Sequence, residues 1–304
     1  MDEAALVVRE QLAGTLGGRL RALEPLARHT SYRIGGPADL LALPDTAAEL
    51  AIVVRTCREA GVPLTLLGAG SNLLVGDGGM PGVVVKLGPG FRRVTWRADG
   101  VVAGAGALLG KLARAAAARG LAGLEAAEGI PGTVGGAVVM NAGAYGWETG
   151  DVLAEVEGVD ERGRLRTLAR SDFVFHYRRT ELPPGLVVTS ATFALGPDDP
   201  AAIAARLGAV RDRRVASQPH GASNAGSIFK NPGDDHAGRL IEAVGLKGRR
   251  IGRARVSERH ANFIVNDGGA TAADVQALMS EAQRTVWERS GVWLEPEIRL
   301  VGRW

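Results

Sequence analysis

The stretch from Glu128 to Trp147 constrains the fold of this chain more than any other. It holds six glycines in twenty residues, among apolar residues such as Ile130, Val134 and Val138. Such a segment belongs in the interior, because its apolar side chains favour burial. Glycine permits positive φ and lets a flat ligand lie against bare backbone. Its buried N–H groups need partners, which a bound anion supplies. A tight packing corner is the competing interpretation.

A second glycine-rich loop, at residues 68–72, follows an apolar run that is typical of a strand. It resembles a dinucleotide-binding fingerprint, but Leu73 occupies the sixth position, where that motif needs glycine or alanine. No helix is expected after it, because residues 77–79 indicate a turn and residues 83–85 another strand. We therefore predict strand–loop–strand, with phosphate bound by backbone N–H groups.

Composition limits the possible functions. The net charge of +3 over 304 residues gives almost no support for nucleic-acid binding. The single cysteine, Cys57, excludes an internal disulfide and is expected to be a buried, inert thiol. The five histidines lack metal-ligand spacing, and no nucleophile elbow or P-loop is present. Without a signal peptide or a long apolar run, a cytoplasmic protein is expected.

Hydrophobic periodicity predicts an alternation of helices and strands. The predicted helices cover residues 4–23, 46–60, 108–119, 200–215, 237–244 and 271–290. The predicted single strands cover residues 40–43, 64–67, 83–85, 186–195 and 260–266. Residues 94–102 and residues 152–168 are each predicted to form a pair of strands, and residues 293–302 a strand-like tail.

Three further segments carry side chains that could take part in catalysis. They are Tyr177-Arg178, the run from Gly226 to Pro232, and the run from Leu294 to Arg299. Each alone has a simpler interpretation. A serine in a glycine turn, as at position 227, is usually structural, and the arginine at 178 or the carboxylate at 297 could lie on the surface.

Together, the two glycine-rich loops resemble the FAD-binding loops of vanillyl-alcohol-oxidase-type flavoproteins, and the three later segments resemble, in order, the catalytic motifs of one family in that group. That family is the UDP-N-acetylenolpyruvoylglucosamine reductases, and the resemblance extends over nearly the whole chain. This chain resembles the shorter form of the family. The longer form has an extra loop that carries a tyrosine, and no counterpart of that loop lies between Arg178 and Ser227. The resemblance implies an α+β fold: FAD-binding subdomains at residues 1–87 and 88–200, the tail 292–304 returning to the latter, and a smaller α+β substrate-binding domain at 201–291.

The resemblance also implies a dissociable FAD, because neither loop carries His or Cys for covalent attachment, and NADPH as co-substrate. The implied FAD contacts are Gly68, Ala69, Gly70, Ser71, Asn72, Gly129, Ile130, Pro131, Gly132, Thr133, Gly135, Gly136 and Asn141. The implied substrate contacts are Tyr177, Lys230 and Asn231.

The reaction implied for the family is reduction of an enolpyruvyl ether to a lactyl ether on a UDP-sugar, a step in peptidoglycan precursor synthesis. The flavin N5 delivers hydride, and Ser227 donates the proton. Arg178 stabilises the developing oxyanion, and Glu297 hydrogen-bonds the enol or carboxyl group. We expect a monomer that binds no nucleic acid and no membrane.

Two alternatives stay open. One is an oxidase or dehydrogenase on the same flavin scaffold with another substrate, and the other is a non-catalytic nucleotide-binding protein. The basic run from Lys247 to Arg259 could bind the UDP pyrophosphate or the NADPH phosphates, or it could be a solvated charged face.

Overall fold

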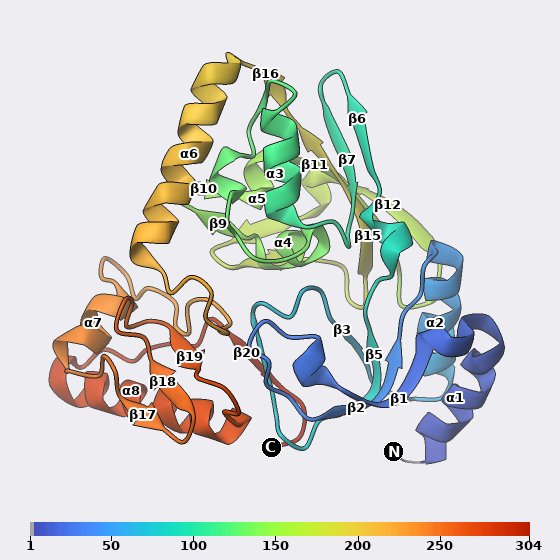
Figure 1. The fold of residues 1–304 in the computed structure, drawn as a ribbon. Coiled ribbons are helices and arrows are strands. Elements are labelled where there is room, and N and C mark those ends of the chain that lie inside the picture. Colours follow the sequence, from blue (N-terminus) through green and yellow to red (C-terminus); the bar gives the residue numbers. More distant parts are fainter. Residues whose placement is uncertain (1–2) are drawn as a thin grey trace. The chain divides into compact units, whose positions relative to one another are not determined.

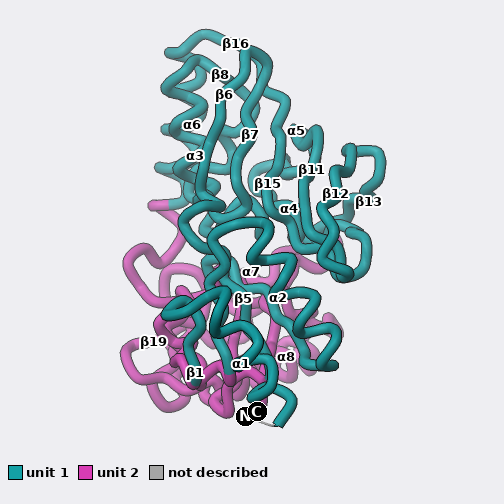
Figure 2. The backbone as a smooth tube through the Cα atoms, turned by 90° about the vertical axis from the view of Figure 1, so that its right-hand side faces the viewer, with its two compact units in different colours: residues 1–22, 40–69, 82–214 teal, residues 23–39, 70–81, 215–304 magenta. Residues whose placement is uncertain are grey.

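The structure, a computed structural model, describes residues 3–304. The chain forms two compact units, each assembled from segments that are far apart in the sequence (Figure 2). Unit 1 comprises residues 1–22, 40–69 and 82–214, and unit 2 comprises residues 23–39, 70–81 and 215–304. The three-part division at residues 87 and 200 stays a prediction.

Unit 1 begins with two helices that pack together, α1 (Glu3–Leu16) and α2 (Ala47–Glu59). The predicted first helix is too long, because Gly17 takes a φ of 51° and the following residues leave the helix. Thr46 caps α2 by accepting a hydrogen bond from the N–H of Glu49. Strands β1 (Leu20–Pro25), β2 (Pro37–Ala42), β5 (Met80–Val85) and β3 (Leu64–Leu66) form a sheet in that order.

The larger part of unit 1 is built on a five-stranded antiparallel sheet of order β12-β11-β15-β7-β6 (Figure 1). Helix α3 (Leu109–Ala117) buries Leu109, Leu112, Ala113 and Ala116, a 3–4 residue spacing that forms one apolar face. That face packs in one core with α4 (Val134–Met140) and the sheet. The sheet strands are β6 (Val94–Arg97), β7 (Gly100–Gly104), β11 (Leu153–Val159), β12 (Leu165–Ala169) and β15 (Val187–Ala194).

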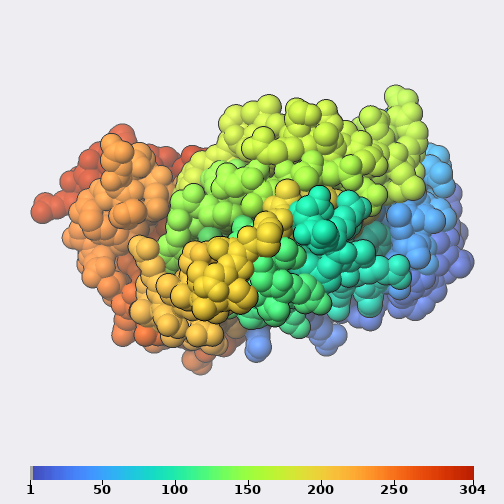
Figure 3. Space-filling view, turned by 90° about the horizontal axis from the view of Figure 1, so that it is seen from above, coloured from blue at the N-terminus to red at the C-terminus, as the bar shows by residue number. Residues whose placement is uncertain are grey.

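Short elements connect these, and α6 (Pro200–Ser217) closes the unit along the side of α3 (Figures 1 and 3). The short elements of unit 1 are η1 (Gly17–Arg19), η3 (Pro89–Arg92), β8 (Leu121–Ala122), η4 (Glu125–Ala127), β9 (Gly143–Ala144), β10 (Trp147–Glu148), α5 (Thr149–Val152), η5 (Arg170–Asp172), β13 (Val174–His176), β14 (Arg179–Glu181) and β16 (Gly196–Pro197).

Unit 2 packs a long helix, α8 (Ala272–Ser290), against small sheets. Thr271 and Asp274 form a capping box at its start, and Gly291 ends it in the left-handed conformation. The other elements are η2 (Leu26–Arg28), β4 (Leu73–Val75), α7 (Ala237–Ala243), β17 (Arg250–Ile251), β18 (Ala254–Val256), β19 (Ile264–Asn266) and β20 (Arg299–Val301).

The C-terminal tail, which the sequence assigns to the subdomain at residues 88–200, pairs here with β4 of unit 2. Strand β20 runs parallel to β4, with Arg299 opposite Leu73 and Val301 opposite Val75. Beyond it, Arg303 donates two hydrogen bonds to the buried carboxylate of Asp39, at 3.1 and 2.8 Å. The strand that follows the first glycine loop therefore obtains its partner from the far end of the chain.

Candidate active site

The two glycine-rich segments meet within unit 1, at Gly68 and Thr133. A Cβ atom added to Gly68 would lie 2.9 Å from the Thr133 Oγ1 atom, closer than real side chains approach. The Thr133 hydroxyl also accepts a hydrogen bond of 3.4 Å from the N–H of Gly136 and so caps α4. Bare backbone at Gly68 is therefore required for this close approach.

The second glycine stretch does not remain a loop throughout, because residues 134–140 form α4, a helix the sequence did not predict. The turn before the helix depends on positive φ at Gly129 (74°) and Gly132 (141°). Inside the helix, a Cβ on Gly135 would lie 2.9 Å from the Cβ of Ala105, so glycine allows close packing there. Gly129, Pro131 and Gly136 stay exposed, and the other predicted contact residues between Gly129 and Gly136 are half-buried.

Arg214, at the end of α6, is a site residue that the sequence interpretation missed. It is 9% exposed, lies against Gly129, and its Nε has no hydrogen-bond partner within residues 3–304. Burial lowers the pKa of its guanidinium, and the positive charge of Arg178 lowers it further, while Tyr145 and Glu128 oppose the shift. An arginine stays charged in spite of such a shift. It therefore presents a desolvated cation beside the glycine stretch.

Glu128, the nearest buried carboxylate, is already paired with another arginine. Arg114 Nη1 donates to both of its oxygens, at 2.8 and 2.9 Å. The pair leaves Arg214 without a carboxylate that it could bind tightly, and an anionic ligand would supply one.

Arg178 lies in the two-residue turn between β13 and β14 and has a φ of 61°. Its Nη1 donates a hydrogen bond of 3.0 Å to the carbonyl of Gly143, and its guanidinium lies 4.7 Å from the ring centre of Tyr177. Tyr177 itself is 48% exposed. Arg179, the next residue, is an exposed arginine paired with Glu181.

Unit 2 brings Ser227, Glu297 and Asn72 together through backbone pairing. The N–H of Glu297 donates to the carbonyl of Ile228, at 2.8 Å, and Asn72 Nδ2 donates to the carbonyl of Glu297, at 3.2 Å. Gly226, with a φ of 77°, shapes the turn before the serine, and its nearest neighbour in that direction is the carbonyl of Ser71. Three predicted motifs, from opposite ends of the sequence, therefore lie in one place.

The Ser227 hydroxyl itself makes no hydrogen bond with any of residues 3–304. The loop around it is held by Asn262, whose amide exchanges hydrogen bonds of 2.9 and 2.8 Å with the backbone of Phe229. The carbonyl of Asn262 accepts a third from the N–H of Ile228. A fixed backbone thus carries a half-buried, uncommitted hydroxyl.

Comparison with known proteins decides the family. The family described as "UDP-N-acetylenolpyruvoylglucosamine reductase, C-terminal domain" matches residues 218–301, and the one described as "FAD binding domain" matches residues 38–169. UDP-N-acetylenolpyruvoylglucosamine reductase 2 of Symbiobacterium thermophilum is 48% identical over 286 residues, 94% of this chain and 93% of that protein. The reductase of Moorella thermoacetica is also 48% identical, over 96% of this chain and 97% of that protein.

The chain belongs to the UDP-N-acetylenolpyruvoylglucosamine reductase family. The solved structure of a family member from Thermus caldophilus agrees, with a TM-score of 0.80, 40% identity, and coverage of 91% of this chain and 97% of that one. These matches confirm the predicted family, the α+β fold class and the FAD-binding region. Within residues 3–304, no helix has both the length and the apolar character that a membrane span requires.

Two of the three residues predicted to bind the family's substrate, Lys230 and Asn231, already have partners inside unit 2. Lys230 Nζ lies 2.5 Å from the Glu295 carboxylate, and the Asn231 side chain accepts from the N–H of Ala237, the first residue of α7. Substrate contact by Lys230 would therefore compete with Glu295. Asn231 and Tyr177 are exposed, and Lys230 is half-buried.

Most of the basic run from Lys247 to Arg259 is paired with carboxylates. Lys247 contacts Glu242, Arg249 contacts Glu281, and Arg250 and Arg255 share Asp267. Arg253 and Arg259 make no side-chain ion pair within residues 3–304. This pairing indicates that most of the run is a solvated charged face and not a binding site for phosphate.

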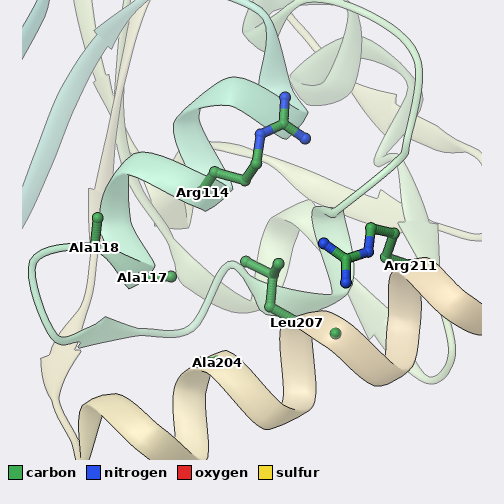
Figure 4. A pocket seen from close by; sticks show the side chains of 7 residues that line it. Arg114, Ala117, Ala118, Ala204, Leu207 and Arg211 are labelled. Atoms are coloured by element: carbon green, nitrogen blue, oxygen red, sulfur yellow. The ribbon is translucent and has the colours of Figure 1, made fainter.

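A shallow groove of about 290 Å3 lies between α3 and α6 in unit 1 (Figure 4). Arg114 borders it on one helix, and Leu207 and Arg211 border it on the other. No predicted site residue lines it. Its one connection to the site is Arg114, which also holds Glu128.

Asn141 differs from the other predicted cofactor contacts because the protein alone buries it completely. Its Oδ1 accepts from the N–H of Gly150, and its Nδ2 donates to Glu148 and to the carbonyl of His176. With all these groups engaged, this geometry supports an indirect contribution from Asn141 rather than contact between its amide and a cofactor.

Proposed function

We propose that this chain reduces UDP-N-acetylglucosamine enolpyruvate to UDP-N-acetylmuramate, with bound FAD and with NADPH as the electron source. Relatives named as this reductase align with more than nine-tenths of the chain. The observation that carries the proposal is the pairing of Glu297 with Ile228, which holds the backbone of Glu297 beside the Ser227 loop. A reaction that needs a proton donor next to a carboxyl-binding group requires that arrangement.

The residues of unit 1 fit FAD on two grounds. The close approach of Gly68 to Thr133 brings the two glycine-rich segments together, so that backbone from both could contact one ligand. The unpartnered Nε of Arg214 needs a buried acceptor, such as a phosphate or a ring carbonyl. The residues of this unit that would hold FAD are Gly68, Ala69 and Gly129 to Gly136, while Gly70, Ser71 and Asn72 of unit 2 stay predicted contacts. When bound, FAD supplies the hydride that it takes from NADPH.

The chain's own groups supply the proton and the charge stabilisation. Ser227 donates a proton to the carbon next to the substrate carboxylate. A serine hydroxyl is a weak acid, so its fixed backbone and uncommitted Oγ are what support this role. Arg178, a permanent cation, stabilises the negative charge that develops on the enolpyruvyl group. Glu297 hydrogen-bonds the same group.

An oxidase or dehydrogenase acting on another substrate is the alternative on this scaffold. Such a reaction removes hydride from its substrate and has no use for a positioned hydroxyl donor. The free Ser227 hydroxyl and the adjacent Glu297 therefore favour reduction. The monomeric state and the cytoplasmic location stay predictions.

The test separates the two half-reactions under anaerobic conditions by stopped flow. Ser227→Ala should leave flavin reduction by NADPH within about twofold of wild type and slow flavin reoxidation by the enolpyruvyl substrate by about a thousandfold, as expected for loss of a general acid. Ser223→Ala, in the same loop, is the matched control and should change neither. Equal slowing of both half-reactions by Ser227→Ala would mean that the serine is structural. A purified protein that is colourless and does not bind added FAD would refute the whole proposal.

A further inference from the structure

Two left-handed residues of unit 1, Asn141 and Arg178, are connected through hydrogen bonds of neighbouring backbone. Among residues 3–304, five residues other than glycine have positive φ, and Asn141 (40°), Tyr145 (56°) and Arg178 (61°) are the three in this unit. L-residues adopt this conformation at a free-energy cost and keep it only where surrounding contacts impose it. Such strain is common at functional sites, so the contacts that impose it here are informative.

The side chain of Asn141 makes three hydrogen bonds, which hold this residue in its left-handed conformation. Its Oδ1 accepts from Gly150 N–H at 3.0 Å, and its Nδ2 donates to Glu148 Oε2 at 2.6 Å and to the carbonyl of His176 at 3.1 Å. The side chain is completely buried by protein. An amide is the one neutral side-chain group of this size that both donates twice and accepts.

One of these contacts, the hydrogen bond to His176, leads to Arg178. His176 is the last residue of β13, immediately before the turn that carries Tyr177 and Arg178. The Arg178 guanidinium in turn donates to the carbonyl of Gly143, two residues beyond Asn141. Asn141 therefore holds the backbone that enters the turn, and its own segment supplies the carbonyl that receives the guanidinium.

We propose that Asn141 is a positioning residue: its hydrogen bond to the His176 carbonyl fixes the Tyr177–Arg178 turn so that the Arg178 guanidinium is held against Gly143. The catalytic consequence rests on the function proposed above for Arg178. The structural part does not, because it concerns only the rigidity of the turn. Asn141→Asp keeps the size and the tolerance for positive φ but loses both donated hydrogen bonds.

A second substitution isolates the bond to His176. In the double variant Asn141→Asp/Glu148→Gln, the new amide at position 148 can donate to the new carboxylate at position 141, so the link between these two positions is restored with reversed polarity. The donation to the His176 carbonyl is then missing and a carboxylate oxygen faces that carbonyl instead, and both changes should loosen the turn. Glu148→Gln alone is the matched control, because a glutamine oxygen still accepts from Asn141 and the bond to His176 remains.

Limited trypsin digestion tests the structural part without any activity measurement. The turn contains the cleavable bonds after Arg178 and Arg179, and Arg97, in the β6–β7 hairpin, provides an internal reference. We expect cleavage at the turn, relative to cleavage after Arg97, to rise about tenfold in the double variant, the change that corresponds to losing one buried hydrogen bond. Glu148→Gln should match wild type. An unchanged ratio in the double variant would overturn the proposal.

The catalytic part is tested by the two half-reactions. The double variant should slow flavin reoxidation by the enolpyruvyl substrate and leave reduction by NADPH near wild type. In an Arg178→Ala background the same change should have no further effect, because a positioning residue acts through the group that it positions. A full additional loss in that background would contradict the role. If wild-type protein does not turn over the substrate, the proposed function fails, and the digestion still decides whether Asn141 fixes the turn.

Asn141→Gly is the second variant if the double variant does not fold. Glycine takes the left-handed conformation without strain and removes the side chain, so turn mobility should rise in the same direction. Turn cleavage equal to wild type in folded Asn141→Gly would also refute the proposal.

Discussion

The backbone N–H of Glu297 lies 2.8 Å from the carbonyl oxygen of Ile228, which ties the C-terminal tail to the loop of Ser227. The bond places two predicted catalytic residues, seventy positions apart, on adjacent backbone segments of unit 2. Asn72, from the first glycine loop, binds the carbonyl of the same Glu297. The contact between Glu297 and Ile228 joins two main-chain groups, so a side-chain substitution at position 297 leaves it intact.

Replacing Glu297 by glutamine should therefore change chemistry without changing the fold. We expect Glu297→Gln to slow flavin reoxidation by the enolpyruvyl substrate by about a hundredfold, typical for a group that stabilises developing charge. Glu295→Gln, an exposed carboxylate two residues away, is the matched control and should affect KM rather than kcat, since it frees Lys230. Steady-state kinetics of both variants checks this, and a glutamine variant at 297 with normal kcat would remove Glu297 from the mechanism.

The contact of Gly68 with Thr133 predicts a rescue experiment. Gly68→Ala should weaken FAD binding, because its methyl group would lie 2.9 Å from Thr133 Oγ1 and push the two segments apart. Thr133→Ala removes that oxygen, so the double variant should recover most of the affinity lost in Gly68→Ala.

Thr133→Ala alone should cost about 1 kcal/mol of stability through the lost cap of α4. Gly14→Ala, in open space within α1, is a control that should bind FAD normally. Fluorescence titration of flavin gives all four affinities. A double variant no better than Gly68→Ala would show that the affinity loss has another origin.

Arg214 gives a prediction in which stability and binding move in opposite directions. Arg214→Met removes a buried donor without a partner, so the protein without FAD should gain about 1 kcal/mol in free energy of unfolding. The same variant should bind FAD about tenfold or more weakly, because a charge-assisted hydrogen bond is lost.

The control for this prediction is Arg213→Met, an exposed neighbour that stacks on Tyr145. It should leave FAD affinity within about threefold, as usual for an exposed surface change. Denaturant unfolding of the FAD-free protein and flavin titration provide the two measurements. Loss of stability together with unchanged FAD affinity in Arg214→Met would mean that Arg214 is structural only.

The ion pair between Arg19, at the end of η1, and Glu49 of α2 predicts a pH dependence of stability. Hydrogen bonds from Arg19 to the Glu49 carboxylate, at 2.6 and 2.7 Å, together with the backbone N–H of Asp45, lower the pKa of Glu49 from 4.5 to about 2. A lowered pKa means that the folded state favours the ionised form. Its contribution is therefore present above pH 4.5 and is lost as the pH falls towards 2.

Glu49→Gln should accordingly destabilise the protein at neutral pH, and its difference from wild type should shrink between pH 4.5 and pH 2. Glu59→Gln, an exposed carboxylate on the same helix, is the control. Urea unfolding at a series of pH values measures the difference, and a gap between Glu49→Gln and wild type that stays constant with pH would contradict the assignment.

The sequence predicted most elements correctly because their signals are local. The 3–4 spacing of Leu109, Leu112 and Ala116 and the capping box at Thr271 depend on neighbours within a few residues. The first helix was predicted too long, since leucine spacing carried the pattern past Gly17. Helix α4 was missed, because its two adjacent glycines oppose helix propensity and only packing against Ala105 favours it.

By itself the sequence determined the family and predicted the cofactor-binding loops and the catalytic motifs, because each motif is a short, contiguous run whose residue types are dictated by chemistry. Only the tertiary structure decided which polar side-chain atoms have a hydrogen-bond partner within residues 3–304 and which do not. It buried Arg214 without a partner, engaged Asn141 in three directions and left the Ser227 hydroxyl uncommitted. Burial and hydrogen-bond satisfaction depend on contacts between residues far apart in the chain, and no local pattern records them.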